Sequence, residues 1–120
     1  MANKYYTSTG QAYTQGTINA KLSQAYKEAD MDAPAACECC GVKRWEHHDH
    51  TISQKELKYL RKTELIWNPI SWSYSCGTCH QEWESYKDGK FEQHKNHEER
   101  MEFVRLHDPE GYQKRINFVE

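Results

Sequence analysis

Residues 37–50, CECCGVKRWEHHDH, and residues 76–80, CGTCH, decide the fold that the sequence predicts. Each stretch holds a pair of cysteines separated by two residues, and two such pairs supply the four thiolates of a closed tetrahedral zinc site. Zinc suits these ligands because it binds thiolate firmly and has no redox chemistry. The spacing therefore predicts a structural Zn²⁺ on Cys37, Cys40, Cys76 and Cys79. Cys39 is a spare, which could replace Cys40 as a ligand.

Composition supports a metal site. Only 37% of the 120 residues are hydrophobic and 28% are charged, so the core is thin and a zinc site worth on the order of 10 kcal/mol would strengthen it. No signal peptide and no membrane span are visible, which predicts a cytoplasmic protein without a membrane partner. Thiols stay reduced in that compartment, so the cysteine pairs are expected to bind metal and not to form disulfides. A net charge of −2 excludes a strongly basic nucleic-acid coat but allows a local basic face.

The pattern along the chain predicts four divisions. The first lacks periodicity, the second has helical spacing that begins at a Thr17 N-cap, and the last contains a charged helix that ends at Asp108-Pro109. In order, they are a flexible N-terminal arm (1–16), an N-terminal helix (17–33), a zinc-binding core (34–88) and a C-terminal helical extension (89–120).

The cysteine pairs are far apart in sequence, because residues 41–75 lie between them, whereas simple zinc ribbons place roughly 15–20 residues there. Within and after this loop the pattern predicts strands over 42–48 and 71–75 and helices over 53–62 and 79–86. A zinc ion that joins the two pairs would bring the end of the first strand to the start of the last helix. His47 and His80 would then meet, and a second divalent metal could bind between them, with His48 pointing to a neighbouring space.

At these residues the chain resembles the HNH (His-Me finger, ββα-metal) endonucleases. The family pattern is a CxxC knuckle, a strand ending in His-His or Asp-His, a central Asn and a second knuckle that reads CxxCH. Here the matching elements are His47-His48, Asn68 and Cys79-His80, together with the cysteine pairs. The resemblance covers about residues 37–86 and implies an α+β fold, with a zinc-stapled ββα-metal core between the N- and C-terminal helices. The string HHDH is also similar to DHDH of the phage recombination endonucleases, which suggests a phage-encoded protein in the cytoplasm of a bacterial host.

The resemblance also implies a role for each residue. His47 and His80 would bind the catalytic cation, His48 would be the general base, and Asn68 would hold the loop of the base or join the metal shell. Neutral imidazole suits proton abstraction near pH 7. The cation, which could be Mg²⁺, Mn²⁺ or another transition metal, would neutralise the scissile phosphate and stabilise the leaving 3′ oxygen. The expected substrate is DNA, which would be nicked or cut in both strands.

Two alternatives stay open. Asp49-His50 offers a second Asp-His register, two residues after His47-His48. The chain could also be a non-catalytic zinc-binding module on the same scaffold, which binds DNA or protein as a phage adaptor or inhibitor. Phage packaging proteins are expected as partners by family analogy alone.

Overall fold

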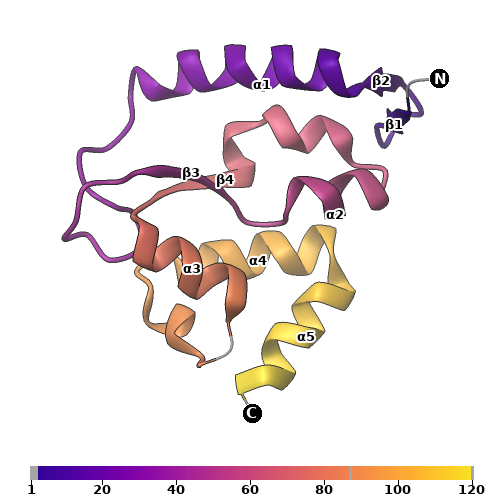
Figure 1. The fold of residues 1–120 in the computed structure, drawn as a ribbon. Helices are drawn as coiled ribbons and strands as arrows, with labels where there is room; N and C mark the ends of the chain where they lie inside the picture. The colour runs from indigo at the N-terminus through magenta and orange to yellow at the C-terminus, as the bar shows by residue number, and fades with distance from the viewer. Residues whose placement is uncertain (1–2, 87, 120) are drawn as a thin grey trace. The chain divides into compact units, whose positions relative to one another are not determined.

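The structure is a computed structural model that describes residues 3–86 and 88–119. Over these residues it contains five α-helices and two sheets of two strands each (Figure 1), which confirms the predicted α+β class. The chain forms two compact units, which we call the helical unit (Met1–Ala33 and Ile52–Trp72) and the cysteine unit (Pro34–Thr51 and Ser73–Glu120). Residues 52–72, which the sequence places in the zinc-binding core, belong to the helical unit in this division. No helix in the described ranges is long and apolar enough to cross a membrane.

A short β-hairpin opens the helical unit, where the sequence predicted a flexible arm. Its strands, β1 (Lys4–Tyr6) and β2 (Ala12–Thr14), pair antiparallel with Tyr5 opposite Tyr13. Aromatic residues and threonine favour strands, but a three-residue strand needs support from elsewhere in the chain. The Thr63 hydroxyl gives such support by donating a 2.7 Å hydrogen bond to the backbone oxygen of Tyr6. Sequence patterning does not predict this hairpin, because its supporting contact spans 57 positions.

Helix α1 (Gln15–Asp30) begins two residues before the predicted start. Its N-cap is Thr14, whose side chain accepts a hydrogen bond from the backbone N–H of Thr17, so Thr17 lies inside the first turn. The buried residues of α1 are Ile18 and Leu22. Around α1 the unit is completed by α2 (Gln54–Tyr59) and the 3₁₀ helices η1 (Thr63–Trp67) and η2 (Pro69–Ser71).

In the cysteine unit the order is strand, strand, helix. Strand β3 (His47–His50) pairs with β4 (Trp72–Ser75), and α3 (Gly77–Ser85) follows directly. The predicted first strand, 42–48, is displaced toward the C-terminus. The reason is a tight turn that occupies residues 37–43, which the Cys37 N–H closes by a 2.7 Å hydrogen bond to the backbone oxygen of Lys43. All four residues of HHDH therefore lie in β3.

The C-terminal part of the cysteine unit contains η3 (Lys90–Gln93), α4 (His97–His107) and α5 (Pro109–Val119). The helix predicted from about residue 92 begins at His97, and it ends before Asp108-Pro109 as expected. A second helix follows immediately, because proline fits the first position of a helix and the Asp108 carboxylate accepts a 3.1 Å hydrogen bond from the N–H of Gly111. Helices α4 and α5 pack against each other.

Trp83 lies at the centre of the packing of this unit, with 1% of its surface exposed. Its indole N–H donates a 2.9 Å hydrogen bond to the backbone oxygen of Thr51. The guanidinium groups of Arg100 and Arg115 lie 4.1 and 3.8 Å from its ring centroid. The indole ring of Trp83 therefore joins helix α3 to the residue that follows β3 and to helices α4 and α5.

The turn at residues 37–43 depends on Gly41, which has a φ of +71°, and a Cβ there would lie 2.7 Å from Nζ of Lys95. We expect Gly41→Ala to lower the free energy of unfolding by about 1–2 kcal/mol, because side chains disfavour left-handed backbone. Urea unfolding would measure this loss. Gly16→Ala is the matched control, since Gly16 lies in α1 with no atom within 4 Å of its added Cβ. It should stabilise by up to about 1 kcal/mol, and equal effects of the two substitutions would contradict the assignment of strain to Gly41.

Candidate metal centre

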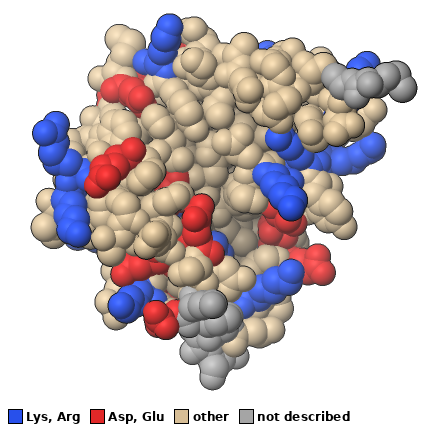
Figure 2. All heavy atoms as spheres, viewed as in Figure 1, with Lys and Arg blue, Asp and Glu red and all other residues tan. Residues whose placement is uncertain are grey.

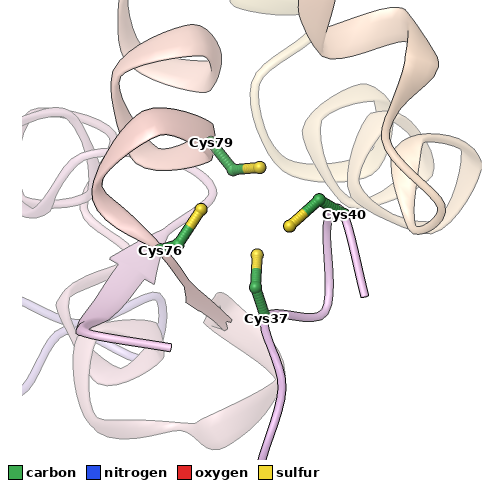
Figure 3. Close-up of side chains that lie close together, drawn as sticks. All are labelled: Cys37, Cys40, Cys76 and Cys79. Carbon is green, nitrogen blue, oxygen red and sulfur yellow. The ribbon is translucent and has the colours of Figure 1, made fainter. Parts of the chain in front are cut away.

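Four cysteine thiols meet in the cysteine unit. Cys37 and Cys40 come from the turn before β3, whereas Cys76 is the N-cap of α3 and Cys79 lies in its first turn. Their sulfur atoms all lie within 4.8 Å of one another and point toward a common space (Figure 3). A tetrahedral zinc site with Zn–S bonds of about 2.3 Å has sulfur atoms about 3.8 Å apart. A small rotamer adjustment would reach that spacing, so the four thiols could hold a structural metal ion such as zinc.

The acidity of these thiols follows from their surroundings. The backbone N–H groups of Lys43 and Val42 point at the Cys40 sulfur and lower its pKa to about 6, because they stabilise the thiolate. Burial raises the pKa of the Cys79 thiol, and the nearby sulfurs of Cys76 and Cys37 raise it further. A divalent cation among the four sulfurs would reverse this second effect, since a coordinated thiol loses its proton. The donor set therefore fits a thiophilic cation.

Cys39 lies outside this group. Its side chain is buried, with Sγ 3.3 Å from the Ser75 hydroxyl and 3.8 Å from Nη1 of Arg100. Burial raises the pKa of the Cys39 thiol, which keeps it protonated at neutral pH. The structure thus pairs Cys37 with Cys40 in the cluster and leaves Cys39 as a packing residue.

Two of the candidate histidines lie together beside the thiols. The ring of His47, on β3, stacks on the ring of His80, on α3, with centroids 4.6 Å apart and planes 17° apart. Both rings line a cavity of about 390 Å³. Its other lining residues are Lys43, Glu46, Gly77, Thr78 and Gln81. A Cβ added at Gly77 would lie 3.8 Å from Nε2 of His47, in ordinary van der Waals contact.

His48 does not join this pair. Successive side chains of a strand point to opposite faces, so His47 and Asp49 share one face of β3 whereas His48 and His50 share the other. The His48 ring lies 5.4 Å from Trp45 and 5.5 Å from Tyr74, measured between ring centroids. The predicted general base is therefore part of an aromatic cluster, on the opposite face from the His47–His80 pair.

Asp49 is not placed like a metal ligand that is accessible from solvent. It is fully buried, and its Oδ2 accepts hydrogen bonds from Nη1 of Arg100 at 3.0 Å and from the Ser75 hydroxyl at 3.2 Å. Its Oδ1 lies 2.9 Å from Nδ1 of His80. Sequence reasoning missed Arg100. The available signal was its place on the apolar face of α4, three and four residues before the buried Phe103 and Val104.

Two other acidic side chains each contact a histidine, Glu84 at His80 and Glu82 at His94. Oε1 of the exposed Glu84 is 3.4 Å from Nε2 of His80. Cys79, Glu82 and His94 form a second group of close metal-ligand atoms, in which Nε2 of His94 is 3.0 Å from Oε1 of Glu82. Within the described residues, the groups of three or more such donors are this one and the four thiols, and the His47–His80 pair belongs to neither.

Asn68 lies in the helical unit. It is the N-cap of η2, and its Oδ1 accepts a 3.1 Å hydrogen bond from the backbone N–H of Ile70. This bond gives Asn68 a local structural role. The role that the family resemblance implies for it stays a prediction.

Comparison with known proteins adds no relative. No protein-family model matches the chain, and neither a curated protein nor a solved structure is similar to it. The resemblance to the HNH endonucleases rests on the sequence motifs and stays a prediction.

Proposed function

We propose that this chain is a metal-dependent HNH endonuclease that hydrolyses phosphodiester bonds in DNA. The observation that supports this function best is the proximity of His47 and His80, whose ring centroids lie 4.6 Å apart, beside four clustered thiols. The rings are nearly parallel, so one of them must rotate before both can bind the same cation in their ring planes. The two rings come from β3 and α3, in the strand–strand–helix order of β3, β4 and α3 that the ββα-metal resemblance implies.

The proposal gives the two ligand sets different ions. The four thiols hold a structural Zn²⁺, because thiolates bind zinc tightly in closed sites. His47 and His80 hold a divalent cation that leaves most positions to water and the substrate phosphate. When bound, this cation would neutralise the scissile phosphate and stabilise the leaving oxygen. His48 would take a proton from the attacking water.

One lysine at the cavity could contact a phosphate near the histidines. Lys43 lines the cavity, and its ammonium group donates a 3.4 Å hydrogen bond to the Thr78 hydroxyl on α3. Glu46 lines the same cavity, so the local field is mixed. Lys and Arg side chains are interspersed with Asp and Glu on the face drawn in Figure 2, in keeping with the net charge of −2. The proposed enzyme would therefore make few phosphate contacts and bind DNA weakly and in a salt-dependent way.

The placement of His48 favours a second candidate function. A general base must lie within hydrogen-bond reach of the water it activates, directly or through one further water. His48 instead packs on Trp45 and Tyr74, on the strand face opposite His47. A non-catalytic zinc module that binds DNA or protein would need only the thiol cluster and its surroundings. Incubation of the purified protein with supercoiled plasmid, with and without Mg²⁺ or Mn²⁺, separates the two functions.

The structural zinc is tested by Cys76→Ser. We expect this variant to lose zinc and to unfold or become molten, because a thin core cannot replace on the order of 10 kcal/mol of metal binding. Elemental analysis and thermal melting give the two measurements. Cys39→Ser is the matched control, since Cys39 and Cys76 are both 1% exposed but Cys39 lies outside the thiol group. Equal melting of Cys76→Ser and wild type, or a wild type without zinc, would show that the assignment is wrong.

The catalytic register is tested by His48→Gln and His50→Gln, which keep the side-chain size. Both histidines are half-buried and share one face of β3, so they form a matched pair. We expect His48→Gln to slow plasmid nicking by about 10²–10⁴-fold, because it removes the general base. His50→Gln should nick DNA at close to the wild-type rate. Zinc content and melting should stay near wild type in both variants.

The same pair of variants distinguishes the alternatives. A loss of nicking only in His50→Gln would move the base to His50 and make Asp49-His50 the active register. A wild-type protein that nicks no plasmid with any divalent ion, while it retains its zinc, would favour the binding module.

A further inference from the structure

A buried arginine of α4, Arg100, contacts Asp49, which in turn lies beside His80. Arg100 is 3% exposed, and each of its three nitrogens has an acceptor. Nε donates to the Thr51 hydroxyl at 3.0 Å, Nη1 to Oδ2 of Asp49 at 3.0 Å, and Nη2 to the backbone oxygen of Asp49 at 2.9 Å. Its planar group lies over the ring of Trp83. These contacts fix one orientation of the guanidinium, and with it the position of Asp49.

The fixed carboxylate leaves one oxygen for His80. Oδ2 of Asp49 is occupied by Arg100 and Ser75, whereas Oδ1 lies 2.9 Å from Nδ1 of His80. Both of these atoms are buried, and neither has a hydrogen-bond partner in the described part of the chain. Their contact is close but not aligned as a hydrogen bond. Buried polar atoms are almost always paired, and such contacts often tighten when a site is filled.

We infer that Arg100 is a positioning residue that, through Asp49, holds the His80 imidazole with its proton on Nδ1 and leaves Nε2 free for a divalent cation. A neutral imidazole has one donor and one acceptor nitrogen, so a carboxylate at Nδ1 selects the tautomer whose Nε2 can bind metal. Oε1 of Glu84, a side chain that is 64% exposed, lies 3.4 Å from Nε2. The inference rests on the proposed cation site of His47 and His80. It assigns Arg100, a residue of the C-terminal extension, a positioning role in that site.

A purely structural ion pair is the competing explanation. Removal of one partner would leave a buried charge and destabilise the fold under either explanation, so single substitutions cannot separate the two. Replacement of both partners by apolar residues is often neutral for stability. Asp49→Val/Arg100→Met is therefore the informative variant, because it removes the carboxylate at Nδ1 together with its counter-charge.

The first experiment is ¹⁵N NMR of the His80 ring in zinc-loaded protein without added cation, with His80→Gln to assign the signals. We expect the Nδ1–H tautomer in wild type and a shift toward the Nε2–H tautomer in the double variant. Arg115→Met is the matched control, because Arg115 also stacks on Trp83 but donates its hydrogen bond to the backbone oxygen of Trp83. It should leave the His80 signals unchanged.

The second experiment is calorimetric titration of the same zinc-loaded proteins with Ni²⁺, a cation that imidazole binds well. We expect the double variant to bind Ni²⁺ about 10–100-fold more weakly than wild type, as for other losses of a group that supports a metal-bound histidine. Arg100→Lys, which keeps the charge but loses the planar fork, should lie between them.

The two readouts separate failure of the inference from failure of the proposed function. A wild-type His80 protonated on Nε2, or an unchanged tautomer in the folded double variant, would overturn the positioning role. If the double variant does not fold, the tautomer of His80 in the wild-type protein is the test of the inference. Wild-type protein that shows the Nδ1–H tautomer but binds no Ni²⁺ would refute the proposed cation site while retaining the effect of Arg100 on the ring.

Discussion

Closure of the chain by four thiols is the constraint on which the rest of the cysteine unit depends. The two cysteine pairs lie at the two ends of a loop that contains all of residues 41–75, and their sulfurs lie within 4.8 Å of one another. Because Cys79 is followed directly by His80, the closure that gathers the thiols also brings His80 to β3. The proximity of His47 and His80 thus accompanies the meeting of the two cysteine pairs. A metal ion at the thiols would hold His47 close to His80 as well as stabilise the fold.

The buried Asp49–Arg100 pair is the second link, and it connects segments that the cysteines do not join. Burial of two charges has a large desolvation cost, which is offset only when the remaining donors and acceptors are satisfied. Here the guanidinium has three acceptors, and one carboxylate oxygen has two donors. The other carboxylate oxygen is directed at His80. The contacts of Asp49 therefore connect α4 to His80 as well as to the core.

The sequence predicted the features that depend on local spacing. The two CxxC pairs predicted the thiol cluster, and Asp108-Pro109 predicted the end of α4. Features that depend on distant contacts were missed. The hairpin of β1 and β2 rests on Thr63. The position of β3 was also missed, although it follows from a local turn at residues 37–43. Arg100 gave a weak signal, since a charged residue on a helix normally lies in solvent and only its partner, 51 positions away, explains its burial.

The alternation of β3 limits any mechanism for this site. Adjacent side chains of a strand diverge, so His47 and His48 cannot both face His80 while HHDH stays a regular strand. His47 and Asp49 lie on the strand face that contacts His80. His48 lies on the other face, where it packs on Trp45 and Tyr74. For His48 to act as base, the attacking water must approach the scissile phosphate from beyond the edge of the strand, on the side opposite the leaving oxygen. In-line displacement places nucleophile and leaving group on opposite sides of phosphorus. A base and a cation on different sides of one strand are therefore compatible with hydrolysis when the phosphate lies across the end of β3.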